Sequence, residues 1–253
     1  MIPIKTEKEI EIMRRAGRLL AGVMKEVVSR TEEGVSTFFL DQLAEDLILK
    51  AGAEPAFKGF KDRGRVYPAV LCASVNNQVV HAIPEENQIL KVGDIIGLDC
   101  GLKYQGYYAD MAVTVPIGQI SKKAGKLIKV TEKSLALAVK KIKPGAYLGD
   151  LSQAIQSCVE KRGFSVVRHL SGHGIGKELH EEPTILNYGK KGAGPILKAG
   201  MVLAVEPMVN IGDWKVKILD DGWTIVTSDG SLSAHFEHTI LVTKTGSEIL
   251  TKI

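Results

Sequence analysis

The feature that most constrains the fold is that the chain repeats itself in a fixed order. Four pairs of segments match: 90–99 (LKVGDIIGLD) with 197–206 (LKAGMVLAVE), 109–114 (ADMAVT) with 236–241 (FEHTIL), 81–84 (HAIP) with 180–183 (HEEP), and the glycine-bounded segments 34–52 with 145–163. One match could arise by chance in a chain rich in Val, Ile and Gly. Four in the same order indicate two related halves.

The repeat also pairs polar residues that could share a site. It aligns Asp99 with Glu206, Asp110 with Glu237, and the His-x-x-Pro segment 81–84 with the one at 180–183. At 253 residues, with 45% hydrophobic and 25% charged side chains, the chain is long enough to bury a sizeable core. We expect a single catalytic domain over 1–253, with halves of roughly 1–120 and 121–253.

Hydrophobic periodicity predicts an α+β chain. Apolar residues recur at helical spacing in four segments, and Thr6 with Glu9 forms a plausible capping box for the first. The predicted helices are 6–28, 36–50, 122–141 and 148–162. Alternating runs rich in β-branched residues lie between them and predict strands at 95–98, 111–115, 201–205, 224–227 and 239–243.

The paired carboxylates indicate a metal site. A turn centred on Tyr104 and Gln105 would bring Asp99 directly opposite Asp110 in a hairpin. Two like charges in an apolar sheet repel, and their burial costs several kcal/mol unless a cation or proton compensates. Neither strand supplies a nearby basic partner. Because Glu206 and Glu237 repeat the arrangement, the charge calls for two divalent ions.

A nitrogen ligand is expected close by, and His173 within Gly-His-Gly-Ile-Gly is the candidate. Glycines on both sides would let a tight loop bring the imidazole near the metals. The segment lacks the Lys-Ser/Thr of a phosphate-binding loop, and 180–184 lacks the second His of a His-Glu-x-x-His zinc motif. Oxygen-rich ligation with one imidazole suits Mn, Fe(II) or Co.

The motifs together resemble methionine aminopeptidase, type I. They are Gly-His173-Gly-Ile-Gly, His180-Glu-Glu-Pro, Glu206-Pro-Met, Asp221-Gly-Trp223 and the segment 231–239 (SLSAHFEHT). The match spans nearly the whole chain. It implies the pita-bread fold, in which a curved antiparallel sheet with pseudo-twofold related halves carries helices on its outer face and two metals at its centre.

The resemblance also implies roles for individual residues. Asp99 would be bidentate on one metal, Asp110 and Glu237 would bridge, and His173 and Glu206 would complete the other. His180 would steady the scissile carbonyl, His81 would contact the substrate amide, and Glu206 would accept a proton. The implied substrate is the N-terminal methionine of nascent polypeptides with a small second residue.

Four residues match the wall of a methionine pocket, in which an apolar, polarizable lining suits a thioether: Tyr67, Cys72, Leu179 and Trp223. The chain also departs from the family. Leu179 replaces an aromatic residue, Leu170 stands where an aromatic residue or Met is typical, Val80 and Ala82 replace Cys and Gly around His81, and His235 replaces Gln. If Val80 and Ala82 approach the substrate channel, the site should be at least as strict about the second residue as its relatives. If Ala82 packs away, it changes nothing.

Two further features are expected from the resemblance or from strand geometry. Asn76 and Ser233 match positions near a monovalent cation site in relatives. His169 and His238 are expected to be structural, because His238 follows Glu237 and so points to the opposite face of the sheet.

Other classes of protein stay open as alternatives. Aminopeptidase P and prolidase share the implied fold but carry a sizeable N-terminal domain, whereas the first catalytic-domain helix here is expected near Thr6. Type II methionine aminopeptidases carry a long insertion between ligands that correspond to His173 and Glu206, which lie close in this sequence. A non-catalytic binding protein with this fold would have lost metal ligands, and all five are present.

Composition limits which binding partners and which cellular compartment we expect. The net charge is only +4, and the lysines form short groups typical of solvated helix faces, so we expect no specific nucleic-acid binding. Three cysteines in apolar surroundings indicate buried thiols in a reducing compartment. Neither a signal peptide nor a membrane span is apparent. We expect a cytoplasmic monomer, with a transient contact to the ribosome possible.

Overall fold

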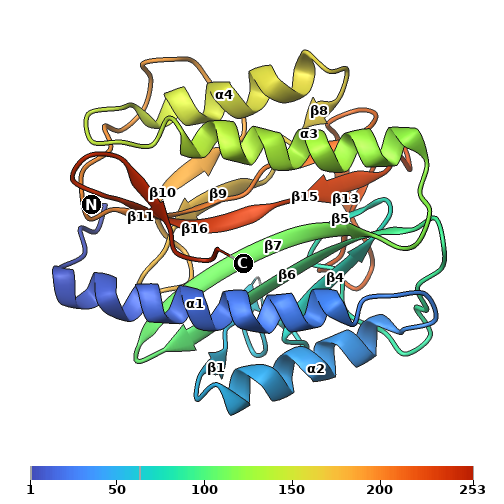
Figure 1. Cartoon of the computed structure of the whole chain (residues 1–253). Helices are drawn as coiled ribbons and strands as arrows, with labels where there is room; N and C mark the ends of the chain where they lie inside the picture. Colours follow the sequence, from blue (N-terminus) through green and yellow to red (C-terminus); the bar gives the residue numbers. More distant parts are fainter. Residues whose placement is uncertain (1, 63, 253) are drawn as a thin grey trace.

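The computed structural model describes residues 2–62 and 64–252. Its four helices are α1 (Glu7–Ser29), α2 (Thr37–Lys50), α3 (Lys122–Val139) and α4 (Leu148–Glu160), close to the predicted ranges. Thr6 caps α1 through the expected box with Glu9. In Figure 1, α1 and α2 lie along one half of the central sheet, and α3 and α4 lie along the other.

The strands form one large sheet and several small ones. The strands are β1 (Glu54–Pro55), β2 (Lys61–Asp62), β3 (Arg65–Val66), β4 (Leu71–Val75), β5 (Gln78–Val80), β6 (Ile95–Tyr104), β7 (Tyr107–Pro116), β8 (Ser165–Val166), β9 (Ser171–Gly174), β10 (Glu181–Leu186), β11 (Val202–Val205), β12 (Met208–Asn210), β13 (Val216–Ile218), β14 (Ile225–Thr227), β15 (Ser233–His235), β16 (Glu237–Val242) and β17 (Ser247–Ile249). The large sheet runs β4-β6-β7-β16-β11-β9 through its centre, and every pair is antiparallel. The order is symmetric about the β7–β16 pair, because the sequence repeat relates β7 to β16 and β6 to β11.

Each half has its own hydrophobic core. Buried side chains of α1 and α2 pack with those of β4, β6 and β7, whereas α3 and α4 pack with β8, β11 and β16. A third cluster lies between the two and includes Met13, Tyr67, Cys72, Leu179 and Ala204. The predicted metal ligands likewise come from both halves, since Asp99 and Asp110 lie on β6 and β7 and Glu237 lies on β16.

The turn between β6 and β7 lies one residue later than predicted, so the register differs from the prediction by two positions. Asp99 pairs with Ala112, and Asp110 pairs with Gly101. The turn residues are Gln105 and Gly106, both with positive φ, as a two-residue hairpin turn requires. The predicted turn at Tyr104 and Gln105 is therefore wrong, and β6 continues well past the predicted strand 95–98. The two aspartates are diagonal neighbours on one face of the sheet.

Candidate metal centre and substrate cavity

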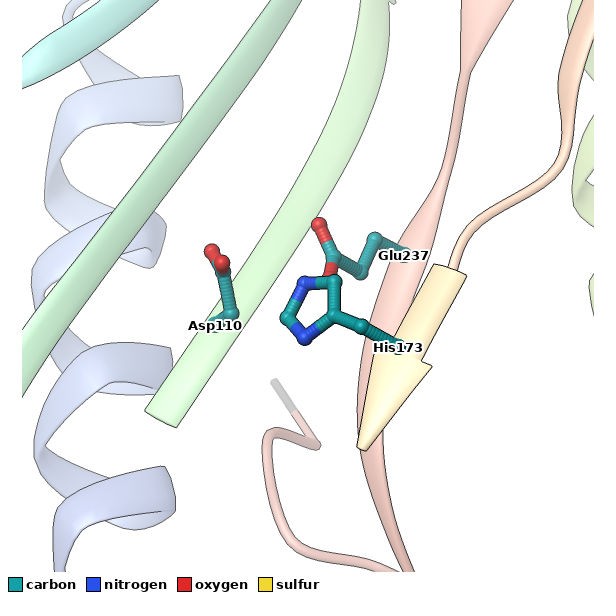
Figure 2. A group of neighbouring side chains, drawn as sticks. All are labelled: Asp110, His173 and Glu237. Carbon is teal, nitrogen blue, oxygen red and sulfur yellow. The ribbon is translucent and has the colours of Figure 1, made fainter. Parts of the chain in front are cut away.

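Asp110, His173 and Glu237 converge on one point from three strands. They extend from β7, β9 and β16, and in Figure 2 their polar ends point toward one another. One ligand atom from each lies within 4.8 Å of the others. A carboxylate–carboxylate–imidazole set at this spacing has the composition of a site for a divalent transition metal.

The two remaining predicted ligands border this group. The Oε1 atom of Glu206 lies 3.6 Å from Nε2 of His173. Asp99 lies next to Asp110 on the same face of the hairpin, and the two carboxyl groups interact. The structure therefore brings together all five residues that the sequence predicted as metal ligands.

The backbone around His173 explains its glycines. The segment is strand β9 and not the predicted tight loop, so that prediction is wrong. A Cβ atom on Gly172 would lie 2.3 Å from the carbonyl oxygen of Ala204, and one on Gly174 would lie 2.1 Å from that of Glu182. The glycines are needed because β9 lies tightly against its neighbours. The Nδ1–H group of His173 donates to the Gly174 carbonyl at 2.9 Å, which leaves Nε2 free for a metal.

The cluster lacks compensating charge within the protein. Asp99, Asp110 and Glu237 are at most 8% exposed, and each has a buried carboxylate oxygen without a hydrogen-bond partner. Among the ion pairs of the described residues, none joins these three acids or Glu206 to Lys or Arg. Burial raises the pKa of Asp99 to about 7, and burial with neighbouring carboxylates raises the pKa of Asp110 and Glu237 well above the usual value. Such a group of acids fits a cationic cofactor.

A cavity of about 770 Å³ opens onto the metal-ligand cluster. All four predicted pocket residues line it: Tyr67, Cys72, Leu179 and Trp223. The rings of Tyr67 and Trp223 meet edge to face at 5.2 Å. The Asp221 carboxylate holds the backbone that carries the second ring, because it accepts hydrogen bonds from the backbone N–H groups of Trp223 and Thr224.

His81 and His180 lie on the cavity wall beside the ligands. The rings of His173 and His180 meet edge to face with centroids 4.4 Å apart, and His180 also contacts Phe60. His81 has a positive φ of 59°, which directs this residue out of the regular strand path just after β5. Burial and the neighbouring His180 lower the pKa of His81 to about 4, so its ring is neutral at pH 7.

Val80 and Ala82, which depart from the family pattern on either side of His81, have different surroundings in the structure. Val80 lines a second cavity of about 460 Å³, which shares His81, His173, His180 and Glu206 with the first. Ala82 is fully buried and lines neither cavity. Its carbonyl oxygen accepts a hydrogen bond from the Tyr67 hydroxyl at 3.0 Å. Ala82 therefore packs away from the substrate channel.

Several cavity residues were not predicted. Phe57, Phe60, Val216 and Ile218 line the cavity from short or irregular segments that give no periodic signal. Ile225 also lines it from the predicted strand 224–227, whose alternation does not indicate what the side chain contacts. His169, expected to be structural, also lines the cavity and packs against Trp214. His238 behaves as expected, since its ring faces Thr251. Asn76 and Ser233 are joined by a backbone hydrogen bond of 2.9 Å.

Comparisons with known proteins agree with this geometry. Residues 11–244 match metallopeptidase family M24. Methionine aminopeptidase 1 of Bacillus subtilis is 50% identical over 253 residues, covering 100% of both chains. The crystal structure of methionine aminopeptidase from Thermotoga maritima matches 100% of both chains with a TM-score of 0.97 at 47% identity. A prolidase from Pyrococcus horikoshii matches 98% of this chain and 63% of its own, with a TM-score of 0.79 at 26% identity.

The fold and the donor set define a metallopeptidase with the pita-bread architecture, and the chain belongs to metallopeptidase family M24. Within that family it belongs with the methionine aminopeptidases, which it matches over its full length. The prolidase likeness is much lower in identity and leaves more than a third of that chain unmatched. The prolidase alternative is therefore not favoured.

Proposed function

We propose that the protein is an aminopeptidase that removes the initiator methionine from new polypeptides with a small second residue, using two divalent metal ions. The observation that carries this proposal is the position of the ligand cluster. Three buried carboxylates, the half-buried Glu206 and His173 border a cavity whose wall includes Tyr67, Cys72, Leu179 and Trp223. The full-length identity to proteins named methionine aminopeptidase supports the same substrate.

The proposed metal ligands are Asp99, Asp110, His173, Glu206 and Glu237, with Asp110 and Glu237 contributing to both ions. The buried carboxylate oxygens without partners fit this role. Mostly oxygen donors with one imidazole favour Co, Mn or Fe(II). When bound, such ions supply Lewis acidity and make a nucleophile available at neutral pH.

The protein's own groups would bind and orient the substrate. The thioether side chain would lie against the Tyr67, Cys72 and Trp223 wall, where apolar and sulfur contacts favour methionine. His180 would donate a hydrogen bond to the scissile carbonyl, and His81 would contact the amide on the leaving side. Glu206, at the border of the cluster and the cavity, would accept the proton that is released.

We further propose that residues 1–253 work as one catalytic domain, since both halves supply ligands. A reducing, cytoplasmic setting is supported by the three cysteines, which are free and buried. Among the helices of the described residues, none has the length and hydrophobicity that a membrane crossing needs. A monomeric state, a transient ribosome contact and a monovalent cation near Asn76 and Ser233 stay predictions.

Release of free methionine from short peptides tests the proposal. The purified protein, reconstituted in turn with Mn²⁺, Co²⁺ and Fe²⁺, should cleave Met-Ala-Ser and leave Met-Leu-Ser intact. Metal analysis should find more than one ion per chain. A Leu-Ala-Ser peptide controls for the methionine pocket. Efficient cleavage of Leu-Ala-Ser, or preferential cleavage of a dipeptide ending in proline, would contradict the proposed substrate.

A further inference from the structure

His235 is a buried imidazole to which the proposed function gives no role. It ends strand β15, it is 2% exposed, and its Nε2 atom has no hydrogen-bond partner. A buried polar atom without a partner normally costs about 1 to 3 kcal/mol. The ring is therefore in a position that the fold would not maintain for packing alone.

The backbone of His235 is fixed from two sides. Its N–H group donates to Oγ1 of Thr114 at 2.9 Å, and that hydroxyl donates back to the His235 carbonyl at 2.8 Å. On its other side, His235 pairs with Met208 of β12. Thr114 is on β7, the strand that carries Asp110. The strand that carries a proposed metal ligand thus also fixes the backbone from which the imidazole extends.

The imidazole faces two carboxylates of the cluster. Nε2 lies 3.6 Å from Oε2 of Glu206 and 4.0 Å from Oε2 of Glu237. The backbone of Glu206 is held separately, because the Asn187 side-chain amide donates to its carbonyl at 3.0 Å. The Glu206 side chain is consequently the part that can adjust toward the ring.

The chemistry of the contact selects one role for Nε2. A lone pair directed at two carboxylate oxygens in a low-dielectric site would repel them, whereas an N–H group would attract them. An N–H donor between two ligand carboxylates fixes their orientation, as partners of metal ligands generally do.

We propose that His235 is a positioning residue, whose Nε2–H group holds the Glu206 carboxylate, and through it the spacing to Glu237, in the arrangement that binds metal. This inference rests on the proposed function, because it presumes that these two glutamates ligate metal. Loss of such a supporting partner typically lowers metal affinity by ~10- to 100-fold.

Three variants of the full chain test this role, with Co²⁺ as the probe. His235→Leu removes the donor while keeping an apolar side chain of similar volume. His235→Gln replaces the ring with an amide that can still donate to Glu206. His238→Leu is the matched control, because that imidazole lies on the neighbouring strand β16, faces Thr251 and meets no ligand carboxylate. The readouts are the calorimetric Kd and the visible absorption spectrum of the bound Co²⁺.

We expect His235→Leu to weaken Co²⁺ binding by ~10- to 100-fold and to alter the spectrum. His235→Gln should restore both readouts, and His238→Leu should keep the native Kd. Unchanged binding in His235→Leu would overturn the proposal. Failure of His235→Gln to restore Co²⁺ binding would also overturn it, because the imidazole would then be a ligand. An equal loss of Co²⁺ affinity in His238→Leu would overturn it as well. The native protein is tested separately, so absence of methionine release there would contradict the proposed function and not this comparison.

Discussion

The two halves of the molecule present equivalent carboxylate pairs on different backbones. In the N-terminal half, β6 and β7 pair over ten residues each around a two-residue turn, and Asp99 and Asp110 lie well inside this ladder. In the C-terminal half, β11 ends at Val205, so Glu206 lies just beyond the last pair with β16. The half with the continuous ladder uses aspartate. The half in which one ligand follows the strand end uses glutamate, which reaches one methylene further.

The connection between the paired strands differs even more. Gln105 and Gly106 join β6 to β7, whereas 207–236 joins β11 to β16 and contains β12, β13, β14 and β15. This long connection supplies Val216, Trp223 and Ile225 to the cavity and carries His235. Both halves therefore carry a pair of carboxylates of the cluster, while much of the cavity wall comes from a long connection that only the C-terminal half contains.

The largest expected effect tests whether the halves contribute equally to metal binding. Asp110→Asn and Glu237→Gln each remove one charge at nearly constant shape, one from each half. Both variants should lose metal, and kcat/KM should fall by more than ~100-fold. Loss of a residue that only supports a metal ligand lowers activity by at most ~100-fold, so a direct ligand should have a larger effect. Metal analysis and methionine release measure this. Glu248→Gln is the control, since that carboxylate pairs with Arg14 away from the site. Full activity with unchanged stoichiometry in both variants would refute the ligand assignment.

A smaller effect should follow from His180→Ala, which is expected to act on substrate without ligating metal. The kcat should fall by ~10²-fold, as for the loss of one transition-state hydrogen-bond donor. Metal content should hold. His81→Ala tests the matching residue of the other half, and His169→Ala controls for a cavity imidazole that packs on Trp214. Metal-free His180→Ala protein would show that His180 is a ligand.

The metal-free protein should lose stability as pH rises. The folded-state pKa of Asp99 is about 7, above its usual value of 3.8, because the carboxyl is buried. Between these values the folded state binds a proton that the unfolded state has released, so the free energy of unfolding falls with rising pH, by up to about 1.4 kcal/mol per pH unit for each such group. Urea unfolding with chelator at pH 5, 6 and 7 measures this slope. Asp99→Asn should flatten it, and a slope of the opposite sign would contradict the buried-acid interpretation.

The smallest effect is expected at Ala82. Because its side chain lines neither cavity, Ala82→Gly should leave the profile of accepted second residues unchanged. Val80→Ala, on the wall of the second cavity, should widen tolerance toward Val and Thr. Cleavage of a panel of Met-Xaa-Ser peptides by both variants decides this. A wider profile in Ala82→Gly alone would place the methyl group in the channel after all.

The sequence predicted which polar residues come together better than it predicted their geometry. The repeat identified four acids, because an acidic residue is conspicuous in an otherwise apolar strand and the same pair occurs in each half. These acids are Asp99, Asp110, Glu206 and Glu237. The turn was predicted one residue too early, which shifted the register by two positions. A turn at Gln105 and Gly106 depends on two positive φ values that the composition of the loop signals only weakly. Residues such as Phe57 and Ile218 were missed because their contact with the cavity depends on tertiary packing.

The contact between the halves also has a mechanical consequence. β7 and β16 meet through the pairs Ala112 with Glu237 and Met111 with His238, and Thr239 adds hydrogen bonds to the backbone of Asp110. This joint between the two bodies also includes the pairing of β5 with β14 and the third cluster, which combines residues of both halves. Carboxylates from both bodies face each other across it. Ions held there would act as a cross-link that closes the joint, and their removal would leave electrostatic repulsion as a force that opens it.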